Sequence, residues 1–315
     1  MNKIKEQLPF TLDKFDAPDL GKHYQGKVRE NFHMDDEIIM VTTDRVSAFD
    51  HVLGTIPFKG QILTEIANFW FEKTRNIAPN HIISYPDPQV LIAQKAITLP
   101  VEVIVRGYIT GSLWREYSSG INGQYGFMLP KDLRMNQKFE EPILTPSTKA
   151  EYGLHDEPIS RDIIVNGLVE ESIYSQAEKY ALDLFSAGQK WAAEQGLILV
   201  DTKYEFGIVD GKLIVIDEIH TPDSSRYWVS EEYEKRYATG KSQKMLDKEN
   251  IRQWLIEKGF SGEGTPPKLT DDIRISLAEQ YIELFHYLTG SSFEPIVGDV
   301  EARIHKNLEY AGVNA

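Results

Sequence analysis

Residues 201–218, with the sequence DTKYEFGIVDGKLIVIDE, constrain the fold more than any other part of the chain. Two runs of strand-like composition flank an Asp-Gly pair, which is a strong signal for a β-hairpin. The first run alternates charged side chains with uncharged ones: Asp201, Thr202, Lys203, Tyr204, Glu205 and Phe206. Because successive side chains of a strand point to opposite faces, we expect one charged face and one largely apolar face.

The register of the returning strand decides which acid faces Lys203. A turn of two residues pairs Lys203 with Glu218, whereas a turn of three residues pairs it with Asp217. We predict the three-residue turn, with Gly211 in the left-handed conformation. The shorter turn would place Asp217 on the face of Tyr204, where an unpaired carboxylate is costly to bury. That reason holds only if this face is closed to solvent.

Carboxylates around a lysine have two interpretations here. The chain has no cysteine and eight histidines, so a cluster of acids suits a hard cation such as Mg²⁺ that holds a polyphosphate. The alternative is a surface ladder of cross-strand salt bridges, which are common and contribute little stability.

Composition limits the partners and the location. A net charge of −14 makes nucleic acid or an anionic membrane an improbable partner, although a local basic pocket could hold a phosphorylated ligand. Without cysteine, disulfides and thiolate chemistry are excluded. The first residues do not resemble a signal peptide, and no stretch approaches the roughly 18 apolar residues of a membrane span, so we expect a cytoplasmic protein.

Strands and helices are mixed along the chain. Strand-like runs lie at residues 37–41, 101–105 and 197–200, and a polar turn is expected at 43–50. Helical periodicity covers residues 61–73 and 171–194, with Gly196 as a stop, and a terminal helix is expected around residues 273–288. Since the elements do not alternate as regular βαβ units, the pattern predicts an α+β fold.

A first basic cluster lies in the segment YQGKVRENF. Gly26 allows close backbone approach to an anion, and Lys27 and Arg29 would point the same way from alternate positions of a strand. With a single glycine, the segment matches neither a Walker loop nor GxGxxG. It is a candidate phosphate grip, and solvated surface charge is the alternative.

A second cluster follows the strand at 101–105. Arg106 ends this strand, and a glycine-rich turn leads to Ser112, which places a bidentate anion donor beside a hydroxyl. The alternatives are an arginine that pairs with a core carboxylate and a serine that caps a helix beginning at Leu113. An anion site and an N-cap are compatible, because helix N-termini bind anions.

A third cluster contains hydroxyls and Lys149 in a proline-containing loop, followed by His155 and Asp156. His155 could carry a proton. The alternative is a Ser/Thr-capped turn in which the histidine bonds to the backbone.

Several motifs, in this order, resemble those of the SAICAR synthetase family: GKVRENF, TDRVSAFD, PVEVIVRGYITGS, TPSTKAE with HD, VDTKYEFG and DEIHTPDSSRYW. The resemblance extends over residues 21–228. The helical segment that follows looks like the extension of the longer members.

The resemblance implies an ATP-dependent amide ligase of purine biosynthesis. ATP, L-aspartate and carboxyaminoimidazole ribonucleotide would give SAICAR, ADP and phosphate, with an acyl phosphate as the expected intermediate. Catalysis would then consist mainly of positioning and charge neutralisation. A kinase that phosphorylates a small-molecule hydroxyl, or a non-catalytic nucleotide-binding regulator, would use a similar set of residues.

The family's site residues transfer onto matching positions. Roles toward ATP and Mg²⁺ are implied for Gly26, Lys27, Val28, Arg29, Glu102, Glu205 and Asp217. Asp217 resembles the family's Mg²⁺ ligand, and Glu205 its ribose-binding or metal-proximal acid. The resemblance implies three catalytic residues: Lys203 and Asp50 toward the reacting carboxylate and the imidazole, and Arg226 at the ribonucleotide phosphate and nearby polar groups. The remaining polar residues of the motifs would bind substrate: Ser47, Arg106, Ser112, Lys149, His155, Asp156, Asp223 and Ser225.

The family fold implied is α+β, with a mostly antiparallel N-terminal sheet domain packed on a larger central domain and ATP in the cleft. The expected boundaries are 1–100 for the nucleotide-binding domain, 101–230 for the central domain with substrate and metal sites, and 231–315 for a C-terminal helical extension. A homo-oligomer is left open by the sequence.

Overall fold

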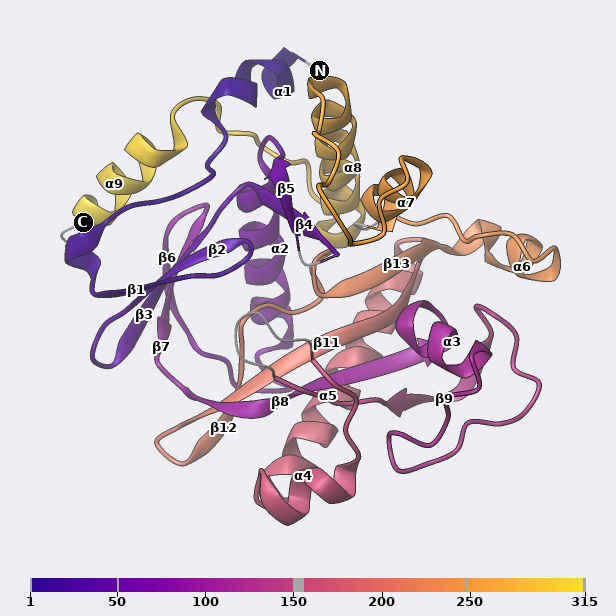
Figure 1. Cartoon of the computed structure of the whole chain (residues 1–315). Coiled ribbons are helices and arrows are strands. Elements are labelled where there is room, and N and C mark those ends of the chain that lie inside the picture. Colours follow the sequence, from indigo (N-terminus) through magenta and orange to yellow (C-terminus); the bar gives the residue numbers. More distant parts are fainter. Residues whose placement is uncertain (1, 50, 150–155, 247–248, 314–315) are drawn as a thin grey trace. The chain divides into compact units, whose positions relative to one another are not determined.

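The computed structural model describes residues 2–49, 51–149, 156–246 and 249–313 (Figure 1). The fold is α+β, as predicted. The chain forms two compact units. The first comprises Met1–Phe69, His81–Lys95 and Leu246–Ala315, and the second comprises Trp70–Asn80 and Ala96–Met245. The three-domain division expected from the sequence stays a prediction.

An antiparallel sheet forms the centre of the first unit, with strand order β1-β2-β3-β7-β6. Its strands are β1 (Lys22–Gln25), β2 (Arg29–His33), β3 (Glu37–Thr42), β6 (Ile82–Asp87) and β7 (Val90–Gln94). A separate hairpin joins β4 (Arg45–Ala48) to β5 (His51–Thr55). The hairpin replaces the polar turn expected at 43–50, because residues of this segment pair in a ladder.

The remaining elements of the first unit come from both ends of the chain. They are α1 (Asn2–Gln7), two short 3₁₀ turns (Leu8–Phe10 and Pro18–Leu20), α7 (Glu249–Glu257), α8 (Asp271–Thr289) and α9 (Val300–Tyr310). The apolar residues of α9 share one buried cluster with Phe15, Phe32 and Ile39. Arg303 and Asn307 of α9 also bond the buried Asp87 of β6. The periodic segment 273–288 is α8, and it is not terminal, since α9 follows it.

A larger sheet forms the centre of the second unit. Its strand order is β10-β8-β11-β12, with β13 added beside β11 and β9 beside β8. The strands are β8 (Ile97–Tyr108), β9 (Lys138–Leu144), β10 (Ser147–Thr148), β11 (Leu197–Val209), β12 (Lys212–Ile216) and β13 (Ser225–Val229). The paired strands of this sheet run antiparallel to one another, so neighbouring strands present long matched faces.

Helix α5 (Glu171–Glu194) packs on β8 and β11 and has the bounds that the periodicity predicts. Gly196 follows with φ +73°, a left-handed conformation that glycine adopts at helix ends. The other helices that contribute residues to the second unit are α2 (Lys59–Thr74), which begins in the first unit, α3 (Gly111–Ser118), α4 (Arg161–Gly167) and α6 (Ser230–Ala238). Figure 1 shows α5 running along the sheet that contains β8 and β11.

Candidate active site

One face of the second unit's sheet is polar where β8 and β11 pair. The register sets Asp201 opposite Arg106, Lys203 opposite Ile104, and Glu205 opposite Glu102. Because directly opposite residues lie on the same face, two acids and a lysine meet an arginine and a glutamate that lie about 100 positions earlier in the chain. We call this surface the polar face.

The other face of the same strands is apolar and closed. Tyr204 and Phe206 are fully buried, as are Val103 and Val105 of β8. Between Leu199 and Asp201 the register of β11 against β13 shifts by a bulge. A bulge changes which face the following residues occupy, and here it directs the charged series 201, 203 and 205 away from α5.

Lys203 holds the centre of the polar face. Its Nζ donates to Glu102 Oε1 and to Glu205 Oε1, both at 2.7 Å. Burial alone would lower the pKa of Lys203, but the carboxylates of Glu205, Glu102 and Asp217 hold that pKa well above its ordinary value. The lysine is therefore a permanent cation whose side chain is still 31% exposed.

The pKa values of the two glutamates beside Lys203 are shifted in opposite directions. Burial opposes the charged form of Glu205, but Lys203 and Lys149 outweigh it and hold the pKa of Glu205 below its ordinary value. Burial raises the pKa of Glu102, and the neighbouring charge of Glu205 adds to the rise. Lys149 bonds Glu205 Oε2, so the lysine of the third sequence cluster joins this site.

Two further residues of the third cluster lie close by. Ser147 of β10 sits opposite Glu102 and donates to its Oε2 at 3.4 Å. The charge of Asp156 also contributes to the raised pKa of Glu102. His155 of this cluster lies outside the described residues.

The hairpin has the two-residue turn, so the predicted register is wrong. Val209 pairs with Lys212, and Glu205 pairs with Ile216. The two-residue turn was rejected on the assumption that the ladder continues to Asp217, which would then be buried beside Tyr204. Instead β12 ends at Ile216, and Asp217 adopts φ +67°, which breaks the alternation. Neither Asp217 nor Glu218 faces Lys203 in the ladder.

Asp217 nevertheless contributes to the electrostatics of the site, since its charge raises the pKa of Lys203. Tyr227 and Tyr204 contact the segment after Asp217 at His220. His220 also has a positive φ, of +57°, and its carbonyl accepts a bond from Tyr227 Oη at 2.8 Å. The His220 ring lies 2.5 Å from Tyr204 Oη. Such backbone strain is typical of positions that present a functional side chain.

A second polar centre lies at the other end of the polar face, around the buried Asp201. Arg106 Nη1 donates to Asp201 Oδ2 at 3.1 Å, and Arg226 Nε donates to Oδ1 at 2.9 Å. Arg106 also bonds Thr145 Oγ1 at 2.8 Å and Ser112 Oγ at 3.3 Å. The pairing of Arg106 with a core carboxylate, one of the alternatives from the sequence, is therefore present.

We call Asp201 with Arg106 and Arg226 the arginine centre, and the start of α3 lies beside it. The helix begins at Gly111 with Thr110 at the N-cap, so Ser112 lies in the first turn and the alternative that it caps the helix is wrong. Gly111 has φ +59°, and a Cβ at this position would lie 1.8 Å from Arg226 Nη1. Glycine is needed here for both reasons. Two guanidinium groups and a helix N-terminus make an anion-binding arrangement.

The remaining candidates of the DEIHTPDSSRYW motif lie beside this centre or behind it. Asp223 lies in the turn before β13, where its N–H donates to Thr221 Oγ1 at 3.3 Å. Ser225 bonds Thr202 Oγ1 at 2.7 Å, and Thr202 alternates with the polar series. The side chain of Ser225 thus points away from the polar face.

The YQGKVRENF segment contains the end of β1, a turn at residues 26–28 and the start of β2 in the first unit, and we call residues 26–29 the 26–29 loop. Lys27 lies in the turn and only Arg29 belongs to a strand, so the prediction of two alternating strand positions is wrong. Gly26 N donates to Arg29 O at 2.8 Å, which closes the turn. Ser47 lies in β4. Asp50 lies outside the described residues.

Sequence reasoning missed three residues of these sites. Asp201 carried the signal of a charge in the alternating series, but its role as the shared partner of two arginines needs the pairing with β8 and β13. Thr145 carried no signal beyond its proline-containing loop. Arg45, whose side chain bonds carbonyls of the 26–29 loop, lay in a segment expected to be a polar turn.

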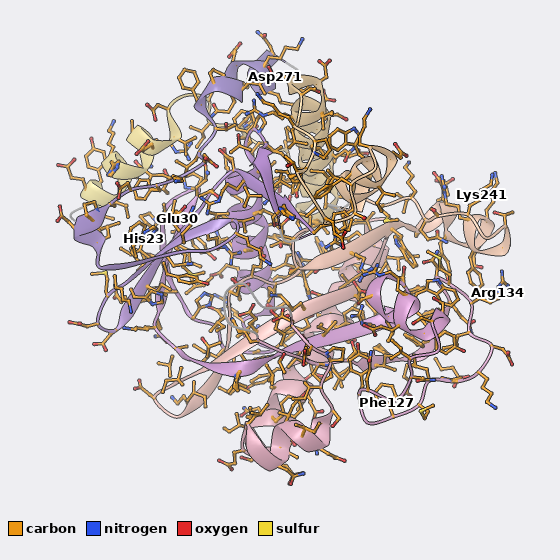
Figure 2. All side chains as sticks on the ribbon, in the orientation of Figure 1. His23, Glu30, Phe127, Arg134, Lys241 and Asp271 are labelled. Atoms are coloured by element: carbon orange, nitrogen blue, oxygen red, sulfur yellow. The ribbon has the colours of Figure 1, made fainter. Side chains whose placement is uncertain are left out.

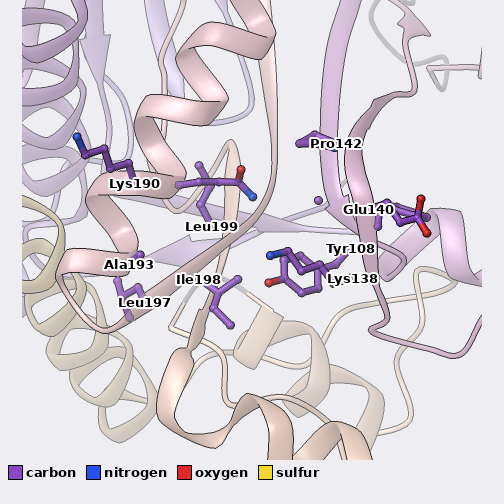
Figure 3. A pocket seen from close by; sticks show the side chains of 12 residues that line it. Tyr108, Lys138, Glu140, Pro142, Lys190, Ala193, Leu197, Ile198 and Leu199 are labelled. Carbon is purple, nitrogen blue, oxygen red and sulfur yellow. The ribbon is translucent and has the colours of Figure 1, made fainter.

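A cavity of about 410 Å³ lies elsewhere in the second unit (Figure 3). It is lined by β9, the end of α5, and parts of β8 and β11, including Tyr108, Lys138 and Gln189. Neither Lys203 nor the arginine centre lines it. None of the helices in the described ranges combines the length and apolar character that a membrane crossing requires.

Comparison with known proteins gives consistent matches. The family model for SAICAR synthetase matches residues 22–268. A phosphoribosylaminoimidazole-succinocarboxamide synthase from Cytophaga hutchinsonii is 48% identical over 313 residues, which cover 98% of this chain and 99% of that protein.

Solved structures match as well. A SAICAR-synthase from Saccharomyces cerevisiae complexed with SAICAR is 34% identical, with a TM-score of 0.79, over 90% of this chain and 100% of that one. A SAICAR synthetase in complex with ADP is 26% identical, with a TM-score of 0.66, over 87% and 100% of the two chains.

Proposed function

The chain belongs to the SAICAR synthetase family, and from this membership we propose roles for its polar residues in the family's reaction. Its function is that of a phosphoribosylaminoimidazole-succinocarboxamide synthase of purine biosynthesis, which is an ATP-dependent ligase. The proposed substrates are ATP, L-aspartate and carboxyaminoimidazole ribonucleotide, and the proposed location is the cytoplasm.

The proposed reaction has two steps. The γ-phosphoryl group of ATP passes to the carboxylate of the ribonucleotide, which releases ADP and leaves an acyl phosphate. The amine of aspartate then attacks the acyl carbon, loses a proton, and expels phosphate as the amide forms. Both steps build negative charge on phosphoryl oxygens, so the protein's main task is to position the groups and neutralise charge.

Lys203 is the residue proposed to neutralise that charge. Its raised pKa keeps it cationic at any physiological pH, and Glu102 and Glu205 fix its position. A cation that is already oriented costs little reorganisation when charge develops on the substrate. Asp50 is proposed to act at the same reacting carboxylate, and Arg226 at the ribonucleotide.

The arginine centre is proposed to bind the phosphate of the ribonucleotide. Arg106 and Arg226 are both oriented by Asp201, and Ser112 sits in the first turn of α3. The planar guanidinium group matches phosphate with two parallel bonds, which a point charge cannot do. Ser47, Lys149, His155, Asp156 and Asp223 stay proposed substrate contacts. Ser225 is not proposed as a contact of the polar face, because its hydroxyl bonds Thr202 on the other side of the sheet.

The 26–29 loop is proposed to bind the phosphates and adenine of ATP, and Glu102 to lie near the nucleotide. Magnesium is proposed to bind near Lys203, where two lysines hold Glu205 ionised and the charge of Asp217 acts on Lys203. Asp217 and Glu205 are proposed to hold it. Mg²⁺ needs only one or two carboxylates when phosphates supply the other oxygens, and it would neutralise phosphate charge.

The observation that carries the proposal is the lysine held between two glutamates on the strand that also carries Asp201 and its two arginines. The test is ADP release by the purified protein with each substrate omitted in turn. ADP release should require both L-aspartate and the imidazole carboxylate, and product should show the mass of SAICAR. Equal ADP release without aspartate would point to a kinase, and nucleotide binding without turnover would point to a regulator.

A further inference from the structure

Arg45 is a buried arginine beneath the 26–29 loop in the first unit. It lies at the start of β4 and is 2% exposed. Its Nε donates to Lys27 O at 3.0 Å, and its Nη2 donates to Gly26 O at 3.0 Å and to Arg29 O at 3.3 Å. A single side chain therefore bonds carbonyls of three residues in a four-residue loop.

Thr43 bonds the carbonyl of Val28, the one residue of the loop whose carbonyl Arg45 does not bond. Val28 O accepts from Thr43 Oγ1 at 2.8 Å and from Thr43 N at 3.0 Å. The carbonyls of all four residues of the loop, 26 through 29, are thus bonded to the same short segment. We call Thr43 and Arg45, with these bonds, the loop clamp.

The loop clamp determines the direction of the loop's N–H groups. In a trans peptide the carbonyl and the following N–H point in opposite directions. Since the carbonyls of Gly26 and Lys27 point toward Arg45, the N–H groups of Lys27 and Val28 point to the opposite side. Successive N–H groups that point to one side form a concave anion site of the kind that binds phosphate.

The loop clamp is itself held rigidly. Asp44 lies between Thr43 and Arg45, and its carboxylate accepts from Leu12 N at 2.8 Å and Gly60 N at 2.9 Å. Arg45 Nη1 also bonds Glu30 Oε1 at 2.5 Å and the carbonyl of Asp13. Every nitrogen of the guanidinium group thus has an acceptor, so the side chain has one arrangement available.

His23 extends this network to the surface. Its Nε2 lies 2.8 Å from Glu30 Oε2, and Figure 2 shows His23 and Glu30 next to one another on β1 and β2. Glu30 is 1% exposed and shares its two oxygens between His23 and Arg45. The buried ion pair is therefore fully bonded, which is the condition under which such pairs are tolerated.

We infer that Arg45 and Thr43 are positioning residues that pre-form the 26–29 loop for the phosphates of ATP. This inference rests on the proposed nucleotide role of that loop. Lysine at position 45 would keep the charge but lacks the fork that bonds three carbonyls, so the N–H groups would lose their common direction. Binding would then pay the entropy of ordering the loop.

The test compares Arg45→Lys with Thr43→Val and Thr43→Ser. We expect Arg45→Lys to raise the Kd for ADP, measured by calorimetry, about tenfold or more, and Thr43→Val to raise it about threefold, because it removes only one of the two bonds to Val28 O. Thr43→Ser keeps both bonds and should bind ADP like the wild type. The KM for ATP should rise in the same order, while the KM for L-aspartate stays within about twofold.

Amide hydrogen exchange of residues 22–31, without nucleotide, gives a readout that does not depend on turnover. Exchange in this segment should be faster in Arg45→Lys and unchanged in Thr43→Ser. A folded Arg45→Lys variant with normal ADP affinity would overturn the inference and leave the proposed function standing. An equal rise in the KM for ATP and for aspartate would overturn it as well. A wild-type protein that binds no ADP would overturn both proposals.

Discussion

The two faces of the sheet in the second unit are made from the same strands but differ in character: one is polar and the other is apolar. On the polar face, Lys203 and Glu205 are oriented by partners, and Lys203 keeps some access to solvent. On the apolar face, Tyr204 and Phe206 are fully buried. Adjacent residues of one strand therefore divide between the proposed chemistry and the stability of the fold. The comparison teaches that substitutions on the two faces should affect different measurements.

The largest effect is expected for Lys203→Ala. It should lower kcat by about 10³ or more, because the cation is proposed to act on charge that develops during phosphoryl transfer. The unfolding transition should stay cooperative, since the side chain is not part of the apolar core. Lys212→Ala, at an exposed position of the same hairpin, is the matched control and should keep normal kcat. Similar kcat values in the two variants would contradict the division between the faces.

Phe206→Ala should have the opposite profile. Loss of a fully buried phenylalanine leaves a cavity and should lower the free energy of unfolding by about 3–5 kcal/mol, measured by urea denaturation. The kcat per folded molecule should remain within about threefold of wild type. A large loss of kcat at unchanged stability would show that the apolar face takes part in the chemistry.

Asp217→Asn tests the acid that leaves the ladder. Asparagine tolerates the left-handed backbone at φ +67°, so the change removes the charge with little strain. If Asp217 holds magnesium, kcat at limiting Mg²⁺ should fall about 100-fold and should recover partly as Mg²⁺ is raised. Asp210→Asn, also at a positive φ but exposed in the turn, is the control. No dependence on Mg²⁺ concentration would remove Asp217 from the metal site.

Arg106→Lys sharpens the comparison within the polar face. The charge remains, but the bonds to Thr145, Asp201 and Ser112 cannot all be kept. The KM for the ribonucleotide should rise about tenfold with a smaller change in kcat. Arg134→Lys, at an exposed arginine labelled in Figure 2, should change neither value. An equal rise in the KM for ATP would argue against a specific phosphate site.

The smallest expected effect is a pH dependence from the apolar side. Burial lowers the pKa of His220 to about 3, below its ordinary value. At pH values between about 3 and about 6.5 the unfolded chain binds a proton that the folded chain does not, so His220 makes the protein less stable as the pH falls through this range. His220→Gln should therefore reduce the loss of stability between about pH 7 and about pH 5. Equal losses in the two proteins would contradict the assignment.

Much of the fold followed from local patterns. The bounds of α5 were predicted from its periodicity and the glycine that follows it, because helix signals act over a few residues. The strand character of β3 and the start of β11 were also predicted. The hairpin at β4 and β5 was not, because a short polar segment becomes a strand only when its partner is in place.

The candidate site was predicted in its chemistry more than in its contacts. The charged face of β11 followed from the alternation of Asp201, Lys203 and Glu205. The hairpin register was predicted wrongly, because the prediction assumed that the strand alternation continues through Asp217. A single left-handed residue ended the ladder and removed the cost on which the prediction depended.

By itself, the sequence determined the α+β class, the long helix, the charged series on β11 and the residue types from which the site is built, since these depend on neighbours a few positions apart. The tertiary structure alone decided that Lys203 lies between Glu102 and Glu205, that Asp201 holds two arginines, and that Arg45 bonds the carbonyls of the 26–29 loop. The physical reason is that strand register and burial depend on pairing between distant segments, and local composition does not specify that pairing.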